Sequence, residues 1–381
     1  GSVSPVDPIS IITKPKKDVY TKTAEKYDIN DNSWTTVSSL NNSRTDFFAE
    51  SSLNNIYVFG GKKDNSNSIV KTVEKYSSEL DEWEVEGEML NPRFGGMSVV
   101  INENIYIIGG IYFDSDNNIL RVSDKIDVYR DDSSGRFWEN LSSMPKINEG
   151  LLSETSYGIA YGRAEHVILN SKNYIYVFCG IKEIYDSNGK ISIESKNDRI
   201  LRYCIEDDNW EYTDILLNNY LQYYQLISPL SISEENRILV CNGAIEDNNI
   251  FYFTNEYFSF SLEEDINNTS FSIGDKSFGV IPFAKYKSDI VKFDNGTNGI
   301  SYYIFGGANE DSYSLDIVER VDTIVSPFLY ENSDDILSSM PIGKSGLKAC
   351  LIYENGAPYI YIIGGCSNGQ VDNFVEIEFN I

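Results

Sequence analysis

The sequence predicts an all-β protein built from a repeated four-stranded unit, and three observations predict it. Short apolar runs closed by glycine recur six times, all four tryptophans occupy one place in the repeat, and amphipathic helical periodicity is nearly absent. Each run is hydrophobic on both faces, as in Ile56-Tyr57-Val58-Phe59. Because such a strand must be covered on both faces, we expect each sheet to pack between neighbouring sheets.

The second strand of each unit ends in the glycines. Glycine ends a strand, permits a positive φ and leaves space for a bulky neighbour. Successive sites lie between 49 and 70 residues apart, which predicts one unit per run with loop insertions of different length. In chain order the runs end at Gly60-Gly61, Gly109-Gly110, Gly180, Gly243, Gly306-Gly307 and Gly364-Gly365.

The third and fourth strands carry a tyrosine and then a tryptophan. The pairs are Tyr27 and Trp34, Tyr76 and Trp83, Tyr129 and Trp138, and Tyr203 and Trp210. Upstream of each glycine-closed run lies a first strand, often opened by a cation such as Arg44. Loops rich in Asn, Asp, Ser and Gly separate the strands, as turns require.

These landmarks, at a period of about 50 residues, make the chain similar to the kelch-repeat family. The resemblance covers nearly the whole length and implies a β-propeller with one four-stranded blade per repeat. We expect six blades, closed by strands from both termini. Residues 1–18 are expected to be an N-terminal extension that includes an expression scar, and residues 19–381 to form the propeller as a single domain.

The way in which the last blade closes is left open by the sequence. Family members pair strands from the two termini within one blade, which removes exposed sheet edges. The last blade is expected to take its outermost strand, with Trp34, from the N-terminus. Two segments compete for its third strand, one at Tyr27 and one in residues 371–381. A seventh, degenerate blade that starts near residues 9–14 is the alternative.

Composition excludes several classes of partner. The chain has 31 Lys and Arg against 58 Asp and Glu, a net charge of −27, which opposes binding to nucleic acid and to anionic membranes. No apolar run approaches the roughly 20 residues that span a bilayer, so no membrane insertion is expected. The five cysteines are odd in number and show no CxxC spacing. Buried free thiols and a cytoplasmic location are therefore expected. Separately, we expect the propeller to be monomeric and any oligomerisation to take place through flanking domains.

Residues that carry chemistry are scarce. His166 is the single histidine, so a histidine-based metal site lacks ligands, and we expect no metal and no cofactor. The stretch Asp114–Asn118 begins like a calcium loop but has Lys125 where the distal glutamate would fall, so an Asx-rich turn is favoured. No catalytic residue is assigned.

One enzymatic alternative follows from the resemblance. Kelch-like N-acetylneuraminate epimerases use His, Arg and Glu in acid–base roles, and Arg163, Glu165 and His166 offer these types in one stretch. Alternation along a strand would send neighbours to opposite faces. A sugar-acid epimerase or carbohydrate-binding propeller is therefore the second hypothesis.

A set of cations is the stronger candidate site. Arg44, Arg93 and Arg163 stand near the starts of first strands, with Lys285 and Lys344 as looser equivalents. Superposed blades would bring them to one mouth of the channel, where guanidinium groups suit acidic side chains of a peptide. The alternative is that each cation caps a loop or pairs with an acid. Aromatic anchors beside them would be Tyr112, Phe113 and Tyr185, on loops after second strands.

The first hypothesis for function is therefore a non-enzymatic interaction module. It would bind a protein or peptide, acidic or phosphorylated, on one face of the propeller, as a scaffold or substrate adaptor of a larger protein. Fold does not by itself deliver this function, so the partner stays undefined.

Overall fold

The computed structural model describes most of the chain between residues 19 and 367. Among these residues there is no helix of the length and apolarity needed to cross a membrane. The described residues are 19–63, 68–132, 135–149, 154–169, 171–185, 191–194, 200–211, 226–227, 229–247, 250–264, 271–280, 284–296, 299–309, 312, 314–323, 331–332 and 337–367.

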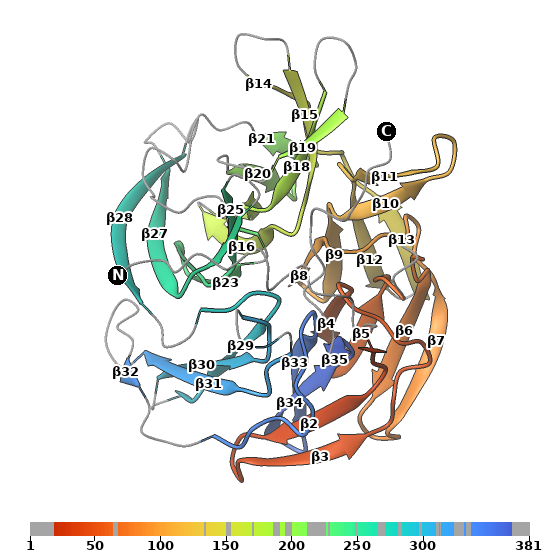
Figure 1. Ribbon diagram of the computed structural model, residues 1–381, viewed down its shortest axis with the longest axis vertical. Coiled ribbons are helices and arrows are strands. Elements are labelled where there is room, and N and C mark those ends of the chain that lie inside the picture. The colour runs from red at the N-terminus through yellow and green to blue at the C-terminus, as the bar shows by residue number, and fades with distance from the viewer. Residues whose placement is uncertain are drawn as a thin grey trace. The chain divides into compact units, whose positions relative to one another are not determined.

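The prediction of an all-β kelch-type propeller with six four-stranded blades is confirmed (Figure 1). The chain divides into two compact units, and each holds three blades. The described part of unit 1 lies within Gly95–Gly279, and that of unit 2 lies in Val6–Phe94 and Val280–Asn373. Whether residues 19–381 act as one domain stays a prediction, and residues 1–18 lie outside the described residues.

Unit 2 contains blades 1, 5 and 6. Blade 1 has β4 (Phe48–Ser52), β5 (Asn55–Phe59), β6 (Thr72–Ser77) and β7 (Glu82–Glu88). Blade 5 has β29 (Asp289–Asp294), β30 (Ile300–Phe305), β31 (Val318–Thr323) and β32 (Glu331–Asn332). Blade 6 has β33 (Lys348–Glu354), β34 (Ala357–Ile363), β2 (Ala24–Asp28) and β3 (Ser33–Val37).

Unit 1 contains blades 2, 3 and 4. Blade 2 has β8 (Met97–Ile101), β9 (Asn104–Ile108), β12 (Ile126–Asp132) and β13 (Gly135–Asn140). Blade 3 has β16 (Arg163–Leu169), β17 (Lys172–Phe178), β20 (Leu201–Cys204) and β21 (Asn209–Glu211). Blade 4 has β23 (Leu230–Glu234), β24 (Arg237–Cys241), β27 (Glu256–Glu264) and β28 (Phe271–Val280).

Blade 6 closes with strands from both ends of the sequence, as predicted. The C-terminal strand β34 pairs with the N-terminal strand β2, with Tyr27 opposite Ile360. Trp34 lies on β3, the outermost strand of this blade. The third strand is therefore the Tyr27 segment. The competing segment, residues 371–381, lies outside the described residues.

Smaller sheets join the loops around the glycine-closed strands. In unit 1 they are the hairpin β10 (Ile111–Asp114) with β11 (Ile119–Val122), the sheet β14 (Ile147–Glu149), β15 (Glu154–Ala160), β18 (Ile181–Tyr185) and β19 (Ile191–Glu194), and the sheet β22 (Leu226–Ile227), β25 (Ala244–Asp247) and β26 (Ile250–Phe253). In unit 2 the short strands β1 (Val19–Tyr20) and β35 (Cys366–Ser367) pair. The longer insertions of unit 1 thus form sheets of their own.

Apolar side chains fill the layers between successive blades of each unit, which explains the double-faced runs. The cluster between blades 6 and 1 includes Ile56, Val58 and Tyr361, all almost fully buried. The tyrosine and tryptophan of a blade stand opposite each other on the third and fourth strands, as Tyr76 and Trp83 do with ring centroids 5.0 Å apart. Such pairs add stability beyond the burial of their area.

Trp34, Trp83 and Trp210 also fasten their blades to the preceding segment of the chain. The indole Nε1 of Trp83 donates to the carbonyl of Ser38, 2.8 Å away, in the loop after blade 6. The carboxylate of Asp81 accepts from the backbone N–H of Ser38 at 2.8 Å and from the hydroxyl of Tyr76 at 2.7 Å. We call this arrangement the tryptophan latch. It recurs with Trp34, Asn32 and Ser338, and with Trp210, Asp208 and Ser142.

Candidate functional site

Four of the five predicted cations occupy one repeated place in the fold. Arg44, Arg93, Lys285 and Lys344 each lie four residues before the first paired residue of an inner strand. Each is buried, with an exposed fraction of 0%. The sequence therefore identified a genuine repeat position, and the structure places its side chains inside the blades.

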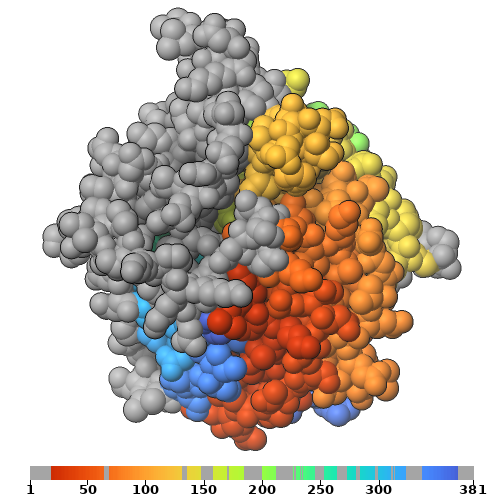
Figure 2. Space-filling model, turned by 45° about the vertical axis from the view of Figure 1, so that its right-hand side comes forward, coloured from red at the N-terminus to blue at the C-terminus, as the bar shows by residue number. Residues whose placement is uncertain are grey.

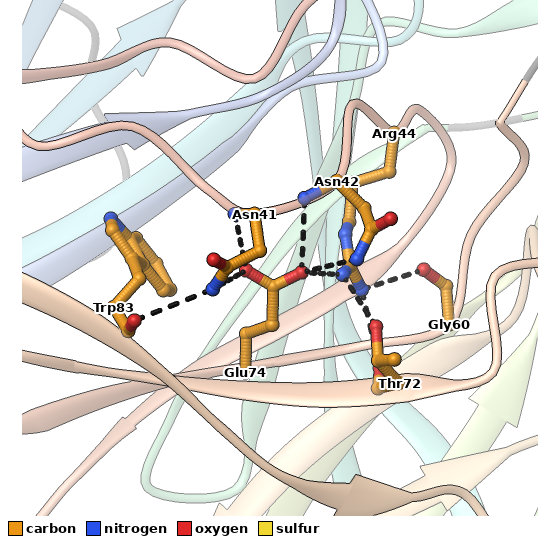
Figure 3. Close-up of polar contacts among 7 residues, drawn as sticks. All are labelled: Asn41, Asn42, Arg44, Gly60, Thr72, Glu74 and Trp83. Atoms are coloured by element: carbon orange, nitrogen blue, oxygen red, sulfur yellow. Dashed lines mark hydrogen bonds and ion pairs between the residues drawn. The ribbon is translucent and has the colours of Figure 1, made fainter.

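Arg44 shows how such a cation is held (Figure 3). Its guanidinium forms an ion pair with the carboxylate of Glu74, on the third strand of the same blade. It also donates to the carbonyl of Gly60 at 3.0 Å and to the hydroxyl of Thr72 at 3.0 Å. Burial lowers the pKa of Arg44 from its ordinary value, and the adjacent Glu74 opposes that shift.

The loop before Arg44 completes the coordination of Glu74. The backbone N–H groups of Asn41 and Asn42 donate to the two carboxylate oxygens, at 2.7 and 3.3 Å. Their side-chain amides donate as well, each at 3.2 Å. Both charges are paired and hydrogen-bonded, which offsets part of the cost of desolvation, although Nε of Arg44 has no hydrogen-bond partner among the described residues.

Blades 5 and 6 repeat the ion pair with lysine. Lys285 pairs with Glu319 on β31, and Lys344 pairs with Glu25 on β2. Burial lowers the pKa of Lys344, and Glu25 opposes that shift. The second carboxylate oxygen of Glu319 has no hydrogen-bond partner among the described residues. The pairs therefore share a position but differ in how completely they are satisfied.

Arg163 does not belong to this set, contrary to the prediction. It is the first paired residue of β16, opposite Phe178, so the equivalent position is Ile159. Its guanidinium donates to the carbonyl of Pro229 instead. In blade 3 the residue that corresponds to Glu74 is Leu201, since each lies opposite the penultimate residue of its second strand.

Blades 3 and 4 thus replace both members of the pair by apolar residues. Blade 3 has Ile159 and Leu201, and blade 4 has Leu226 and Phe258. In blade 2 the corresponding residues are Arg93 and Asp127, and each is fully buried. No blade has a cation at the position of Arg44 together with an apolar residue at the position of Glu74. This is expected, because a buried charge without its partner is strongly destabilising.

The sequence carries a signal for these pairs in the spacing between the acid and the tyrosine of the third strand. Glu25 and Glu74 each stand two residues before the tyrosine of the third strand, and Asp127 does the same before Tyr129. An acid at this fixed spacing, present only in repeats that also carry the cation, identifies an internal partner. Binding of an external acidic partner by the cations stays untested, but their burial leaves no side-chain surface for it.

His166 and its neighbours do not form a pocket together. The register of β16 against β17 is regular, with Glu165 opposite Tyr176 and His166 opposite Ile175, so the two side chains lie on opposite faces. His166 hydrogen-bonds to Asn173 at 2.9 Å, whereas Glu165 accepts from Ser231 at 2.5 Å. Burial raises the pKa of Glu165. The grouping that a sugar-acid enzyme would need is absent here.

The Asp114–Asn118 stretch is an Asx-rich turn. The carboxylate of Asp114 accepts from the backbone N–H of Asp116 at 3.0 Å and from the side-chain amide of Asn117 at 2.8 Å. That amide, together with other hydrogen bonds, lowers the pKa of Asp114. Within the described ranges, no group of three or more His, Cys, Asp or Glu could hold a metal ion.

The predicted aromatic anchors lie on the small sheets of unit 1. Phe113 is 48% exposed and Tyr112 half-buried on β10, and the hairpin stands at the surface in Figure 2, in yellow-orange. Arg121 of β11 fixes the hairpin to β18 through a bidentate pair with buried Glu183, at 2.8 and 2.9 Å. Tyr185 ends β18, and its side chain lies outside the described residues.

All five cysteines are free and buried. Cys179 and Asn242 replace the first glycine of blades 3 and 4 and keep its left-handed backbone, each with a φ of 59°. A Cβ at Gly109 would overlap the carbonyl of Ile159, which explains why glycine is used there. Burial raises the pKa of Cys179 to about 12, and neither polar atom of the Asn242 amide has a hydrogen-bond partner in the described structure.

Comparison with known proteins points to the same repeat. Residues 43–90 and 92–145 match models of the Kelch motif, and these ranges correspond to blades 1 and 2. A kelch repeat-containing protein of Dictyostelium discoideum is 25% identical over 262 residues, which are 65% of this chain and 32% of that protein. The chain thus spans about a third of the length of this relative. With six four-stranded blades and the glycine, tyrosine and tryptophan landmarks in register, the chain belongs to the kelch-repeat family.

Proposed function

We propose that the chain is a non-enzymatic protein-interaction module, which acts as a scaffold or substrate adaptor within a larger protein. Kelch-repeat propellers commonly bind proteins, and loops carried by a rigid scaffold are where binding usually takes place. The partner contacts the sheets inserted after the second strands of unit 1, with Phe113 as an anchor.

The hairpin β10–β11 is the observation that supports this site. Blade 2 already has its four strands, so this hairpin is an addition to the repeated blade. Even so, the bidentate pair between Arg121 and Glu183 holds the hairpin in place, and Glu183 is fully buried. A fixed hairpin that leaves a phenylalanine about half exposed is typical of a contact surface, because a rigid aromatic side chain loses little entropy on binding.

The experiment is quantitative affinity purification from native lysate with the whole chain as bait. We expect Phe113→Asp to lose specific partners that the wild type retains, at an unchanged melting temperature. Phe137→Asp is the matched control, because Phe137 lies on the outer strand β13 of the same blade and is 40% exposed. Equal retention by Phe113→Asp and the wild type would move the contact away from this hairpin.

The same experiment tests the alternative of an acidic or phosphorylated ligand. Competition with a phosphopeptide pool would release the partners if cations recognised them. Release by phosphopeptides, together with insensitivity to Phe113→Asp, would favour that ligand class over the hairpin contact.

A further inference from the structure

The turn between the first and second strands of blade 1 has an unusual residue. Two-residue turns with positive φ at both positions join these strands, and Asn is the preferred residue at the first position. Asn102 and Asn355 occupy it in blades 2 and 6, with φ of 48° and 50°. In blade 1 it is Leu53, with φ of 49° and an exposed fraction of 50%. Leucine gains nothing locally from a left-handed conformation in water, which indicates another role.

Two more exposed apolar side chains lie at the same end of these blades. The side-chain oxygen of Asn54 accepts from the backbone N–H of Tyr353 at 3.2 Å, which ties the blade 1 turn to the blade 6 turn. Tyr353 is 46% exposed, and Leu80, in the turn between β6 and β7, is 69% exposed. We call Leu53, Leu80 and Tyr353 the turn surface. All three belong to unit 2.

Exposed carboxylates lie at the same end of blades 1 and 6 as the turn surface. Asp31, Glu79 and Glu82 are exposed in the neighbouring turns. Lys26, on β2 of blade 6, is engaged by Glu354 at 2.8 Å, and its Nζ lies 4.5 Å from the ring centre of Tyr359. The field of the whole chain has the same sign, with a net charge of −27. An acidic segment, a nucleic acid or an anionic membrane would therefore be repelled here.

We propose that the turn surface binds a lysine- or arginine-rich segment of a partner protein, with an apolar side chain of that segment against Leu53 and Tyr353. Charge complementarity brings the segment to the surface and sets its orientation, and the apolar contact slows its release. Leu53 lies in the turn that precedes β5, whereas Gly60 and Gly61 follow the end of β5, so the turn surface lies at the strand ends away from the glycines. The inference does not depend on the hairpin contact at Phe113.

The test uses a display library of random dodecapeptides selected on the whole wild-type chain. We expect the selected peptides to be enriched in Lys and Arg around an apolar residue. We expect them to bind Leu53→Asn about tenfold more weakly, the effect of losing one anchoring contact. Because Asn tolerates the left-handed region better than Leu, this variant should fold at least as stably as the wild type. Ile168→Asn is the control, since Ile168 is 58% exposed on β16 of unit 1.

Three outcomes would overturn the proposal: no enrichment, acidic or neutral selected peptides, or equal binding to Leu53→Asn and the wild type. Self-association in sedimentation that Leu53→Asn abolishes would assign the surface to a second copy of the chain, which also overturns it. Phe113→Asp should leave peptide binding unchanged, so failure here and failure of the hairpin contact are separately visible.

Discussion

The three blades of unit 2 and two of the three blades of unit 1 fill the same position of the repeat in different ways, whereas blade 2 has Arg93 and Asp127 there. In blades 1, 5 and 6 of unit 2 a buried Arg or Lys pairs with a Glu of the third strand. In blades 3 and 4 of unit 1 both residues are apolar. The same two blades of unit 1 have lost the first glycine, and their insertions form extra sheets.

The difference shows which features of a blade are coupled. Charge is kept or lost at both positions together, because removal of one partner leaves a buried charge unpaired, whereas an apolar pair of similar volume is tolerated. The tryptophan latch is independent of that choice. Blades 1 and 6, which have the ion pair, and blade 3, which lacks it, all carry the latch.

The largest expected effect comes from breaking one ion pair of unit 2. Glu25→Ala leaves Lys344 buried without its carboxylate and should lower the free energy of unfolding by about 3–5 kcal/mol. The double variant Glu25→Leu with Lys344→Ile, which copies blade 3, should recover most of that loss. Chemical denaturation of the wild type, Glu25→Leu, Lys344→Ile and the double variant forms the cycle, and Glu25→Ala is measured beside it. A double variant no more stable than Glu25→Ala would contradict the coupling.

The tryptophan latch should contribute equally in the two units. Trp83→Phe in unit 2 and Trp210→Phe in unit 1 each remove one indole donor and some packing, at a cost of about 1–3 kcal/mol. Urea denaturation followed by far-UV circular dichroism measures both. If the two variants lose different amounts of unfolding free energy, by more than the experimental error of one measurement, the contribution of the latch depends on the ion pair.

Asn242→Gly should stabilise unit 1 by about 1 kcal/mol. It removes a buried amide that has no hydrogen-bond partner within the described part of the chain, and it restores the residue that best adopts the left-handed backbone. Differential scanning calorimetry gives the shift in melting temperature. Cys179→Gly is the matched control, because the thiol has no comparable polar penalty, and it should be neutral or slightly destabilising. A stabilisation by both variants would make backbone conformation the cause.

The smallest effect is expected from Glu165→Gln. Burial raises the folded-state pKa of Glu165, so its ionisation disfavours the folded state. The stability of the wild type therefore falls as the pH rises from the pKa of the unfolded state to the higher pKa of the folded state. The glutamine variant should be more stable at pH 7. The difference should vanish as the pH falls below about 4.3, the ordinary glutamate pKa, where both side chains are neutral. Denaturation midpoints between pH 4 and 8 test this, and a difference that does not depend on pH would exclude ionisation as its source.

The sequence predicted the blades because their signals are local. A double-faced apolar run, a glycine that follows it, and a tyrosine with a tryptophan seven residues later, as in Tyr76 and Trp83, each follow from contacts within one or two strands. The tryptophan latch was not predicted. It joins Trp83 to the backbone of Ser38, and no side-chain identity encodes a backbone carbonyl as acceptor.

The candidate site was predicted in part. The repeat position of Arg44, Arg93, Lys285 and Lys344 followed from superposed motifs, but Arg163 was aligned wrongly because its loop is four residues out of step with theirs. Whether a cation at that position faces a partner or the interior depends on where the third strand places its acid. Glu74 is 30 residues from Arg44 in sequence, so this contact exists only after the sheet has formed.

By itself the sequence determined the fold class and favoured six blades, because the spacing of apolar runs, glycines and aromatics fixes how a repeating sheet can bury both faces. It left open which segment supplies the third strand of the last blade, and the pairing of β2 with β34 decided that. The tertiary structure decided which charges are internal and which apolar side chains stay in water. Arg44 is buried despite its charge, because pairing with Glu74 offsets its desolvation. Leu53 is exposed despite its apolar side chain, because a tight turn holds it outside the core.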